Sequence, residues 1–155
     1  METNLKAGLY LLSTPIGNRG DITLRTLEIL KECDLIVSED TRVARKLLSM
    51  YQISLDGRNL VSYSDNSNSY ARRKIVESIH NSKSVALISD AGSPLISDPG
   101  YKLVCEVISS GADVHSIPGP SSVISALSLS GLPFDKFYFH GFLSSREKKI
   151  LEELE

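Results

Sequence analysis

The fold is set by the stretch GLYLLSTPIGNRGDITLRTLEIL, residues 8–30. Its first six residues form a short apolar run, and Pro15 and Gly17 follow this run. The pattern predicts a buried strand that ends in a tight loop. Leucines then recur at helical spacing behind Asp21 or Thr23, either of which is a suitable N-cap. The chain therefore begins with a strand, a loop and a helix.

The same alternation continues through the chain. Strands are expected at residues 35–38, 60–61, 84–89 and 114–117, and helices are expected over the apolar stripes within 43–51, 71–79, 103–108 and 121–130. Connections this short imply βαβ crossovers, which place parallel strands in one sheet with helices on both faces. We predict an α/β domain with a mostly parallel five-stranded sheet.

The last part of the sequence predicts the start of a second domain. Aromatic residues alternate over residues 137–143, which is typical of a strand. Ser144 and Glu147 have capping-box spacing and predict a helix over residues 146–155. We therefore expect an N-terminal α/β domain over residues 8–133 and a truncated C-terminal domain from residue 134 to residue 155.

Composition is that of a globular domain. Of the 155 residues, 41% are hydrophobic and 23% are charged, and 17 basic against 19 acidic side chains give a net charge of −2. No apolar run approaches the ~20 residues of a membrane span, and no secretory signal is visible, so we expect a cytoplasmic protein with no membrane contact. Cys33 and Cys105 are expected in the core. The three histidines lack ligand spacing, which predicts no metal site.

Three loops combine glycine with proline, at residues 13–21, 89–100 and 117–122. Each follows an expected strand, and parallel strands bring such loops to one sheet edge, where ligands bind. Glycine allows close backbone approach, and amides at a following helix N-terminus favour an anionic group. Gly and Pro also simply end strands, but three such loops at one edge favour a ligand site.

Several well-known sites are excluded. No loop has the G-x-x-x-x-G-K-[ST] phosphate motif, and the first loop has Gly17 and Gly20 without the G-x-G-x-x-G fingerprint. No G-x-S-x-G elbow is present. Nucleoside triphosphates, nicotinamide cofactors and acyl transfer are therefore poorly supported.

Four segments resemble the tetrapyrrole-methylase superfamily. They read STPIGNRGDITLRTLE from residue 13, SEDTRVARKLL from residue 38, ISDAGSPLISDPGY from residue 88 and IPGPSSVISALSLSGLP from residue 117. Within that superfamily they are most similar to enzymes that 2′-O-methylate the ribose of a cytidine in 16S ribosomal RNA. The resemblance implies S-adenosylmethionine as methyl donor, a homodimer, and a donor cleft between two domains. One segment departs from the family pattern, because YSDNSN occupies residues 63–68 where the family has a histidine- and glutamate-containing stretch.

Donor and catalytic residues follow from these loops. The residues expected to bind the donor are Pro15, Ile16, Gly17, Asp90, Ala91, Gly92, Ser93, Pro118, Gly119, Ser121 and Ser122. Methyl transfer depends mainly on aligning the methyl carbon with a ribose hydroxyl and on excluding water. A general base still helps a weakly acidic hydroxyl, and Glu39, Asp40 and Asp90 are carboxylates at strand ends. The resemblance implies donor contact for Asp90, which leaves Glu39 and Asp40 as the candidates. Asp40 alternatively caps its helix or pairs with Arg42.

A basic stripe is expected on the second helix. Arg42, Arg45 and Lys46 fall opposite Val43 and Leu47 on a helical wheel. Such a stripe is often only a solvated face, but beside an RNA-modifying site it suits phosphate contacts, and Arg19 and Arg25 extend it.

The function expected from the resemblance is ribose methylation of 16S ribosomal RNA in the 30S subunit. One alternative is methylation of a tetrapyrrole carbon, and another is a catalytically silent adenosyl-binding fragment. TPIGN at residues 14–18 has the form found in the RNA enzymes, whereas tetrapyrrole enzymes have a G-x-G-P-G-D-like loop there. Because the cleft needs a second wall, we expect this chain alone to bind the donor weakly and to be inactive.

Overall fold

The computed structural model describes residues 5–66, 69–133 and 135–154. The chain divides into two compact units, Met1–Ser122 and Val123–Glu155.

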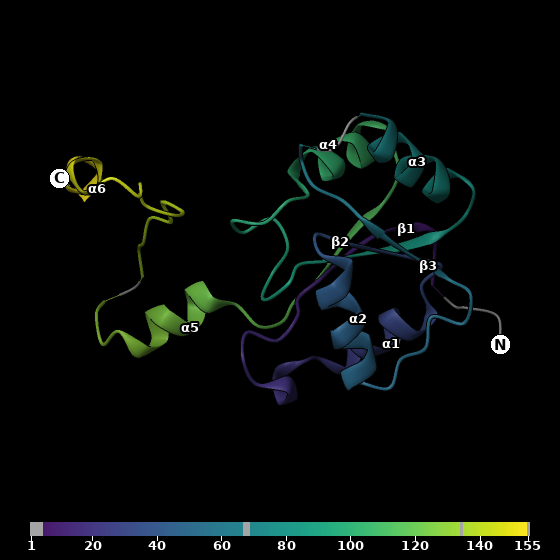
Figure 1. Cartoon of the computed structure of the whole chain (residues 1–155), viewed down its shortest axis with the longest axis horizontal. Helices are drawn as coiled ribbons and strands as arrows, with labels where there is room; N and C mark the ends of the chain where they lie inside the picture. Colours follow the sequence, from purple (N-terminus) through teal and green to yellow (C-terminus); the bar gives the residue numbers. More distant parts are fainter. Residues whose placement is uncertain (1–4, 67–68, 134, 155) are drawn as a thin grey trace. The chain divides into compact units, whose positions relative to one another are not determined.

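The first unit is built on a five-stranded parallel sheet (Figure 1). Its strands are β1 Gly8–Leu12, β2 Leu35–Ser38, β3 Asn59–Ser62, β4 Ser84–Ile88 and β5 Val114–Ile117, in the order β3-β2-β4-β1-β5. All four strand pairings are parallel. The predicted α/β class and the parallel five-stranded sheet are confirmed.

Helices cover both faces of this sheet (Figure 1). They are α1 Leu24–Glu32, α2 Thr41–Met50, α3 Ser69–His80 and α4 Tyr101–Ser109, with a short 3-10 helix η1 at Arg19–Asp21. Strand side chains alternate between two cores: Tyr10 and Leu12 of β1 pack with α1 and α2, whereas Leu9 packs with α3 and α4. The central strands are buried on both sides, which explains their continuous apolar sequences.

Two helix starts are fixed by side chains that the sequence analysis singled out. Thr23 Oγ1 accepts a hydrogen bond from the backbone N of Thr26 at 3.1 Å and caps α1. Asp40 Oδ1 accepts from the backbone N of Arg42 at 2.8 Å and caps α2. Asp21, the other candidate for the cap of α1, does not serve as one.

The buried face of α2 differs from the predicted one. Ala44 and Leu48 are buried, whereas Val43 and Leu47 are half-buried and Met50 is 49% exposed. The apolar arc of this helix is wide, and the core takes its Ala44 edge because α2 lies over Ile36 and Ile88 of the sheet. The other edge of the arc remains free to line a pocket.

The expectation that both cysteines lie in the core is correct for Cys33 and wrong for Cys105. Cys33 is fully buried, but Cys105 is exposed. Leu103 and Val107 form the buried face of α4, and a residue midway between them along a helix points away from that face.

The second unit contains most of α5, Ser122–Leu129, and α6, Glu147–Leu154. The strand predicted over residues 137–143 is wrong: no described strand lies in this range, and its aromatic side chains are exposed. Alternation alone does not make a strand, because a strand needs a neighbour for its backbone hydrogen bonds. The predicted capping box is also not formed, since the backbone N of Ser144 donates to Glu153 Oε2 at 2.9 Å and not to Glu147.

Candidate functional site

The three glycine and proline loops meet at one edge of the sheet. The first two are joined by a backbone pair: the N of Thr14 donates to the O of Gly92 at 2.9 Å, and the N of Gly92 donates to the O of Thr14 at 3.0 Å. Thr14 Oγ1 also donates to the O of Ser89 at 3.2 Å. The parallel topology therefore brings these loops together as predicted.

Serine hydroxyls connect the third loop to the other two. Ser13 Oγ and Ser93 Oγ share a hydrogen bond at 2.9 Å, and Ser93 Oγ donates to the O of Pro120 at 3.2 Å. Because Ser93 uses its hydrogen for Pro120, Ser13 is the donor in the bond between the two hydroxyls, and Ser13 Oγ also lies 3.5 Å from the O of Ile117. Ser13 is buried, so these bonds hold the loop bases together at the strand ends.

Glycine at position 119 is required by this loop packing. A Cβ atom there would lie 2.7 Å from Ser13 Cβ, which is closer than two carbon atoms can approach. Gly92 has a φ of +82°, a conformation that favours glycine, and its Cβ position faces Ile16. The close approach at position 119 is between two loops of the protein itself.

The residues predicted to bind the donor differ in accessibility. Ile16, Gly17, Asp90, Ala91, Pro118, Gly119 and Ser122 are exposed, Pro15, Ser93 and Ser121 are half-buried, and Gly92 is buried. The loop tips are therefore accessible at the sheet edge, with Asp90 and Ser122 as their polar side chains, while Gly92 and Ser93 make hydrogen bonds to the other loops.

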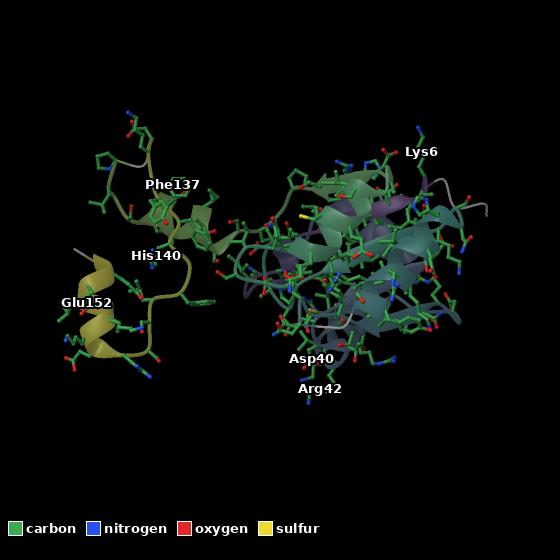
Figure 2. The ribbon with its side chains drawn as sticks, turned by 90° about the horizontal axis from the view of Figure 1, so that it is seen from above. Lys6, Asp40, Arg42, Phe137, His140 and Glu152 are labelled. Atoms are coloured by element: carbon green, nitrogen blue, oxygen red, sulfur yellow. The ribbon has the colours of Figure 1, made fainter. Side chains whose placement is uncertain are left out.

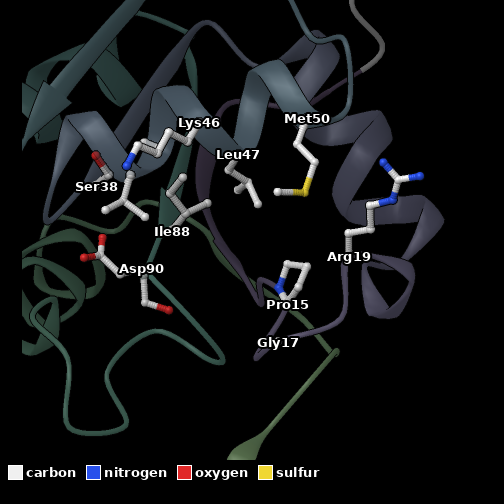
Figure 3. Close-up of a pocket in the computed structure, with 12 residues that line it drawn as sticks. Pro15, Gly17, Arg19, Ser38, Lys46, Leu47, Met50, Ile88 and Asp90 are labelled. Carbon is white, nitrogen blue, oxygen red and sulfur yellow. The ribbon is translucent and has the colours of Figure 1, made fainter.

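A pocket of about 270 Å³ opens between α2 and the ends of β2 and β4 (Figure 3). Its walls combine apolar side chains of α2 with the first loop. The lining residues are Pro15, Gly17, Arg19, Ser38, Val43, Ala44, Lys46, Leu47, Met50, Ile88, Ser89 and Asp90. We call this space the α2 pocket. Two of the three predicted loops contribute to it, the first and the second.

Ser38 is the unusual member of this lining. It is the last residue of β2, is paired in register with Ile88 of β4, and is 1% exposed. Its Oγ has no hydrogen-bond partner among the described residues. Buried hydroxyls in folded proteins are nearly always hydrogen-bonded, so this one is suited to a ligand in the α2 pocket.

Acidic side chains lie beside the α2 pocket. Glu39, Asp40 and Asp90 line a second space of about 470 Å³ with Thr41, Arg42 and Ser62, and Asp90 borders both spaces. Partial burial raises the pKa of Glu39, and the nearby carboxylates of Asp90, Asp98 and Asp40 raise it further. Burial also raises the pKa of Asp98, and Asp90 adds to that effect.

Asp40 is held by Arg42, in agreement with the alternative role expected for it (Figure 2). The Arg42 guanidinium donates from Nη2 to Asp40 Oδ2 at 2.6 Å and from Nε to Oδ1 at 3.0 Å. These hydrogen bonds lower the pKa of Asp40 to about 2. A carboxylate this acidic and this fully paired is a poor proton acceptor, so Glu39 is the better placed of the two predicted bases.

The five basic residues predicted to bind RNA do not form one stripe. Lys46 and Arg19 line the α2 pocket, and Arg45 is exposed on α2. Arg42 pairs with Asp40. Arg25 lies elsewhere, in a groove with Glu28, Glu32 and His115. The basic residues are thus in different surroundings: two line the α2 pocket, one is in an ion pair, one is exposed to solvent and one lies in a separate groove.

The described ranges contain neither a metal-binding cluster nor a membrane span. No group of three or more of their His, Cys, Asp or Glu side chains is arranged to hold a metal ion. None of the described helices is both long and apolar enough to span a bilayer.

The loop arrangement matches a known family. Residues 8–155 match the family model of the tetrapyrrole (corrin/porphyrin) methylases. The chain belongs to this family. The tetrapyrrole methylase fold is also seen in solved structures: a conserved hypothetical protein from Aeropyrum pernix K1 is 24% identical with a TM-score of 0.66 over 86% of this chain and 46% of that one. The uroporphyrin-III-C-methyltransferase from Thermus thermophilus is 21% identical with a TM-score of 0.58, over 84% of this chain and 54% of its own.

Curated relatives within the tetrapyrrole methylases are more similar in sequence. A protein of Mesorhizobium japonicum named Ribosomal RNA small subunit methyltransferase I is 49% identical over 151 residues, covering 97% of this chain and 50% of the relative. The chain spans about half the length of the first curated relatives that it matches.

Sequence reasoning misses part of the lining of the α2 pocket. It assigns no role to Ser38, the first residue of a family motif, and it places Val43, Leu47 and Met50 in the core. A hydroxyl at the end of an otherwise apolar strand is the one available signal for Ser38. Periodicity does not show which edge of the α2 arc the core takes.

Proposed function

We propose that this chain is the N-terminal part of an S-adenosylmethionine-dependent methyltransferase that 2′-O-methylates the ribose of a cytidine in 16S ribosomal RNA. The supporting observation is its 49% identity, over 97% of the chain, to the Mesorhizobium japonicum relative named for small-subunit ribosomal RNA. We also propose that it acts on the 30S subunit in the cytoplasm as a homodimer, and that residues 8–133 form its N-terminal domain.

The loop tips fit a methyl donor. When bound, S-adenosylmethionine supplies an electrophilic methyl group on a positively charged sulfur. Asp90 is exposed at the end of β4 and offers a carboxylate to hydroxyl or ammonium groups. The exposed backbone at Ala91, Pro118 and Gly119 allows close contact, and the bonded loop bases keep these tips in place. Preorganised loops of this kind position a ligand without ordering cost at binding.

Glu39 is the proposed general base. It follows β2 directly and shares the second space with Asp90, so it stands between the donor loops and α2. A raised pKa makes its carboxylate a stronger base than an ordinary glutamate. In this proposal Glu39 accepts the proton of the ribose hydroxyl, and Arg42 keeps Asp40 out of that role.

The RNA backbone is proposed to cross the outer side of α2. Arg45 and Lys46 are exposed on α2 and Arg19 is exposed in η1, and none of the three has an ion pair with any described residue. Phosphate contacts by arginine and lysine supply most of the sequence-independent affinity for RNA.

The test uses a chimera that carries residues 1–155 in place of the matching half of the Mesorhizobium japonicum relative. It is incubated with labelled donor and with 30S subunits that lack the modification, and the product is mapped by nuclease digestion and mass spectrometry. We expect methyl incorporation at one cytidine ribose, with the intact relative as positive control. Methylation of a tetrapyrrole alone, or none while the relative is active, would contradict the proposal.

A further inference from the structure

The α2 pocket contains a buried polar atom that the protein itself does not use. Ser38 Oγ is buried, has no partner among the described residues, and belongs to a residue of the pocket lining. The alternation of β2 explains its direction: Leu35 and Val37 pack with α3 and α4, so Ile36 and Ser38 face α1 and α2. A buried hydroxyl without a partner lowers the stability of the folded chain, and a ligand with a polar edge would supply the missing hydrogen bond.

The rest of the lining describes the shape and polarity of that ligand. Apolar side chains of Val43, Leu47, Met50 and Ile88 form one part, suited to the faces of a flat ring. Figure 3 shows Lys46 reaching from α2 toward the end of β2, with Asp90 on the β4 side of the opening. With about 270 Å³, the α2 pocket is near the lower end of the volume range of small-molecule sites, roughly 300–1,000 Å³, and suits one nucleoside.

Charge distinguishes between the two reactants of the proposed reaction. Arg19 and Lys46 contribute two positive charges to the lining and Asp90 contributes one negative charge. A positively charged sulfonium donor is not favoured by such a surplus, whereas a nucleotide within an RNA chain carries phosphates that are attracted by it. The third predicted donor loop, residues 117–122, contributes nothing to the lining.

We propose that the α2 pocket receives the base of the acceptor nucleotide, flipped out of the RNA, and that Ser38 Oγ hydrogen-bonds its polar edge. This inference rests on the proposed RNA substrate. Enzymes that act on one nucleotide commonly extrude it into such a pocket, where polar side chains contact its Watson–Crick edge. Ser38 is therefore a positioning residue: it holds the nucleotide so that the ribose lies near the loop tips.

The experiment measures binding and does not need methyl transfer. Two fluorescent single-stranded RNA hexamers are titrated against the 155-residue chain; they are identical except that one has a central cytidine and the other an abasic ribose. Both have the same phosphates, so only a base pocket distinguishes them. We expect roughly tenfold tighter binding of the cytidine hexamer, the size of one buried hydrogen bond with its apolar contact.

Two variants assign that preference to the pocket. Ser38→Ala should reduce it to about threefold or less, and Met50→Trp, at an exposed rim position, should abolish it by filling the opening. Both should bind the abasic hexamer as the unaltered chain does, because the phosphate contacts remain. Ser109→Ala, at the exposed end of α4, is the matched control.

Several outcomes would overturn the inference. These are absence of RNA binding, equal affinity of the unaltered chain for both hexamers, and a preference in Ser38→Ala that is as large as in the unaltered chain. Loss of S-adenosylhomocysteine binding in Met50→Trp would assign the pocket to the donor instead. If the chimera fails to methylate 30S subunits while the base preference and its loss in the variants persist, the pocket inference stands and the proposed function fails.

Discussion

Asp65 Oδ2 accepts a hydrogen bond from the backbone N of Gly100 at 3.2 Å, between two segments 35 residues apart in sequence. Gly100 is the N-cap residue of α4 and has no side chain to cap the helix, so the carboxylate of Asp65 serves in its place. Asp65 Oδ1 also accepts from the backbone N of Lys102 at 3.3 Å and from the Tyr63 hydroxyl at 2.9 Å. The segment that departs from the family pattern thus stabilises the helix that follows the second loop.

Asp65→Ala should lower the free energy of unfolding by about 1–2 kcal/mol, because the first amides of α4 lose their partner. Asp65→Asn should cost less, since asparagine also caps helices well. Urea unfolding followed by circular dichroism measures both. Glu77→Ala, at an exposed position of α3, is the control. A midpoint of Asp65→Ala equal to that of the control would show that the cap contributes nothing.

Gly119→Ala should destabilise the first unit by about 1–3 kcal/mol, because the added carbon would overlap Ser13 Cβ. The double variant Ser13→Gly with Gly119→Ala removes the overlap and should recover part of that loss. Thermal unfolding of the unaltered chain, Ser13→Gly, Gly119→Ala and the double variant tests this coupling. Additive effects of the two substitutions would refute the overlap as the cause.

Stability should fall in alkaline solution. Burial, with the Asp65 carboxylate, raises the pKa of Tyr63 to about 12 from 10.0, and burial raises the pKa of Cys33 to about 11 from 9.0. Both groups are neutral acids that ionise less readily in the folded state, so their contribution is complete below the unfolded pKa and is lost as pH rises through the folded one. The decline should therefore lie between about pH 9 and pH 12.

Tyr63→Phe should flatten the part of that decline between about pH 10 and pH 12. Urea unfolding at several pH values gives the slope, and Tyr70→Phe, at an exposed tyrosine, should leave it unchanged. If the free energy of unfolding declines equally with pH in both variants, the ionisation of Tyr63 does not contribute to the decline.

Asp90→Asn in the chimera should weaken binding of S-adenosylhomocysteine about tenfold, because a neutral amide accepts a weaker hydrogen bond than a carboxylate. Gly92→Val should also weaken it, by displacing the loop that Thr14 and Gly92 join. Isothermal titration calorimetry measures both, with Asp113→Asn as control. Unchanged affinity in folded forms of both variants would place the donor elsewhere.

Replacing Arg42, Arg45 and Lys46 with glutamine should weaken RNA binding and reduce the slope of its salt dependence by about 0.7–0.9 for each phosphate that is no longer neutralised. Because Arg42 is paired with Asp40, it is less available to a phosphate than Arg45. Arg42→Gln alone should therefore change the slope less than Arg45→Gln alone. Filter binding at several salt concentrations provides the slopes. A triple variant with glutamine at Lys31, Arg73 and Lys83 removes the same charge elsewhere and is the control. Equal slopes of the salt dependence in both triple variants would show that the basic residues of α2 are only solvated and do not contact phosphates.

The succession of strands and helices along the chain of the first unit, and the parallel class of its sheet, could be predicted from the amino-acid sequence. Apolar runs and helical spacing are local signals, so they predicted all five strands, and the residues before α1 and α2 included the caps Thr23 and Asp40 among two candidates for each helix. Parallel topology then placed the three loops at one edge. Alternation over residues 137–143 failed because a strand also needs a partner, which local pattern does not supply.

The atoms that meet at that edge depend on how the elements pack, and the sequence did not predict them. Ser38 is buried beneath α2 because of the register of β2 against β4, and the loops are joined by Ser13 and Ser93, 80 residues apart in sequence. The lack of room for a side chain at position 119 also comes from a distant residue, Ser13. Such contacts depend on how segments far apart in the sequence pack against each other. The residue pattern of one segment does not indicate which atoms of the other segment it will meet. The loops could therefore be predicted from the sequence, while the pocket beneath α2 could not.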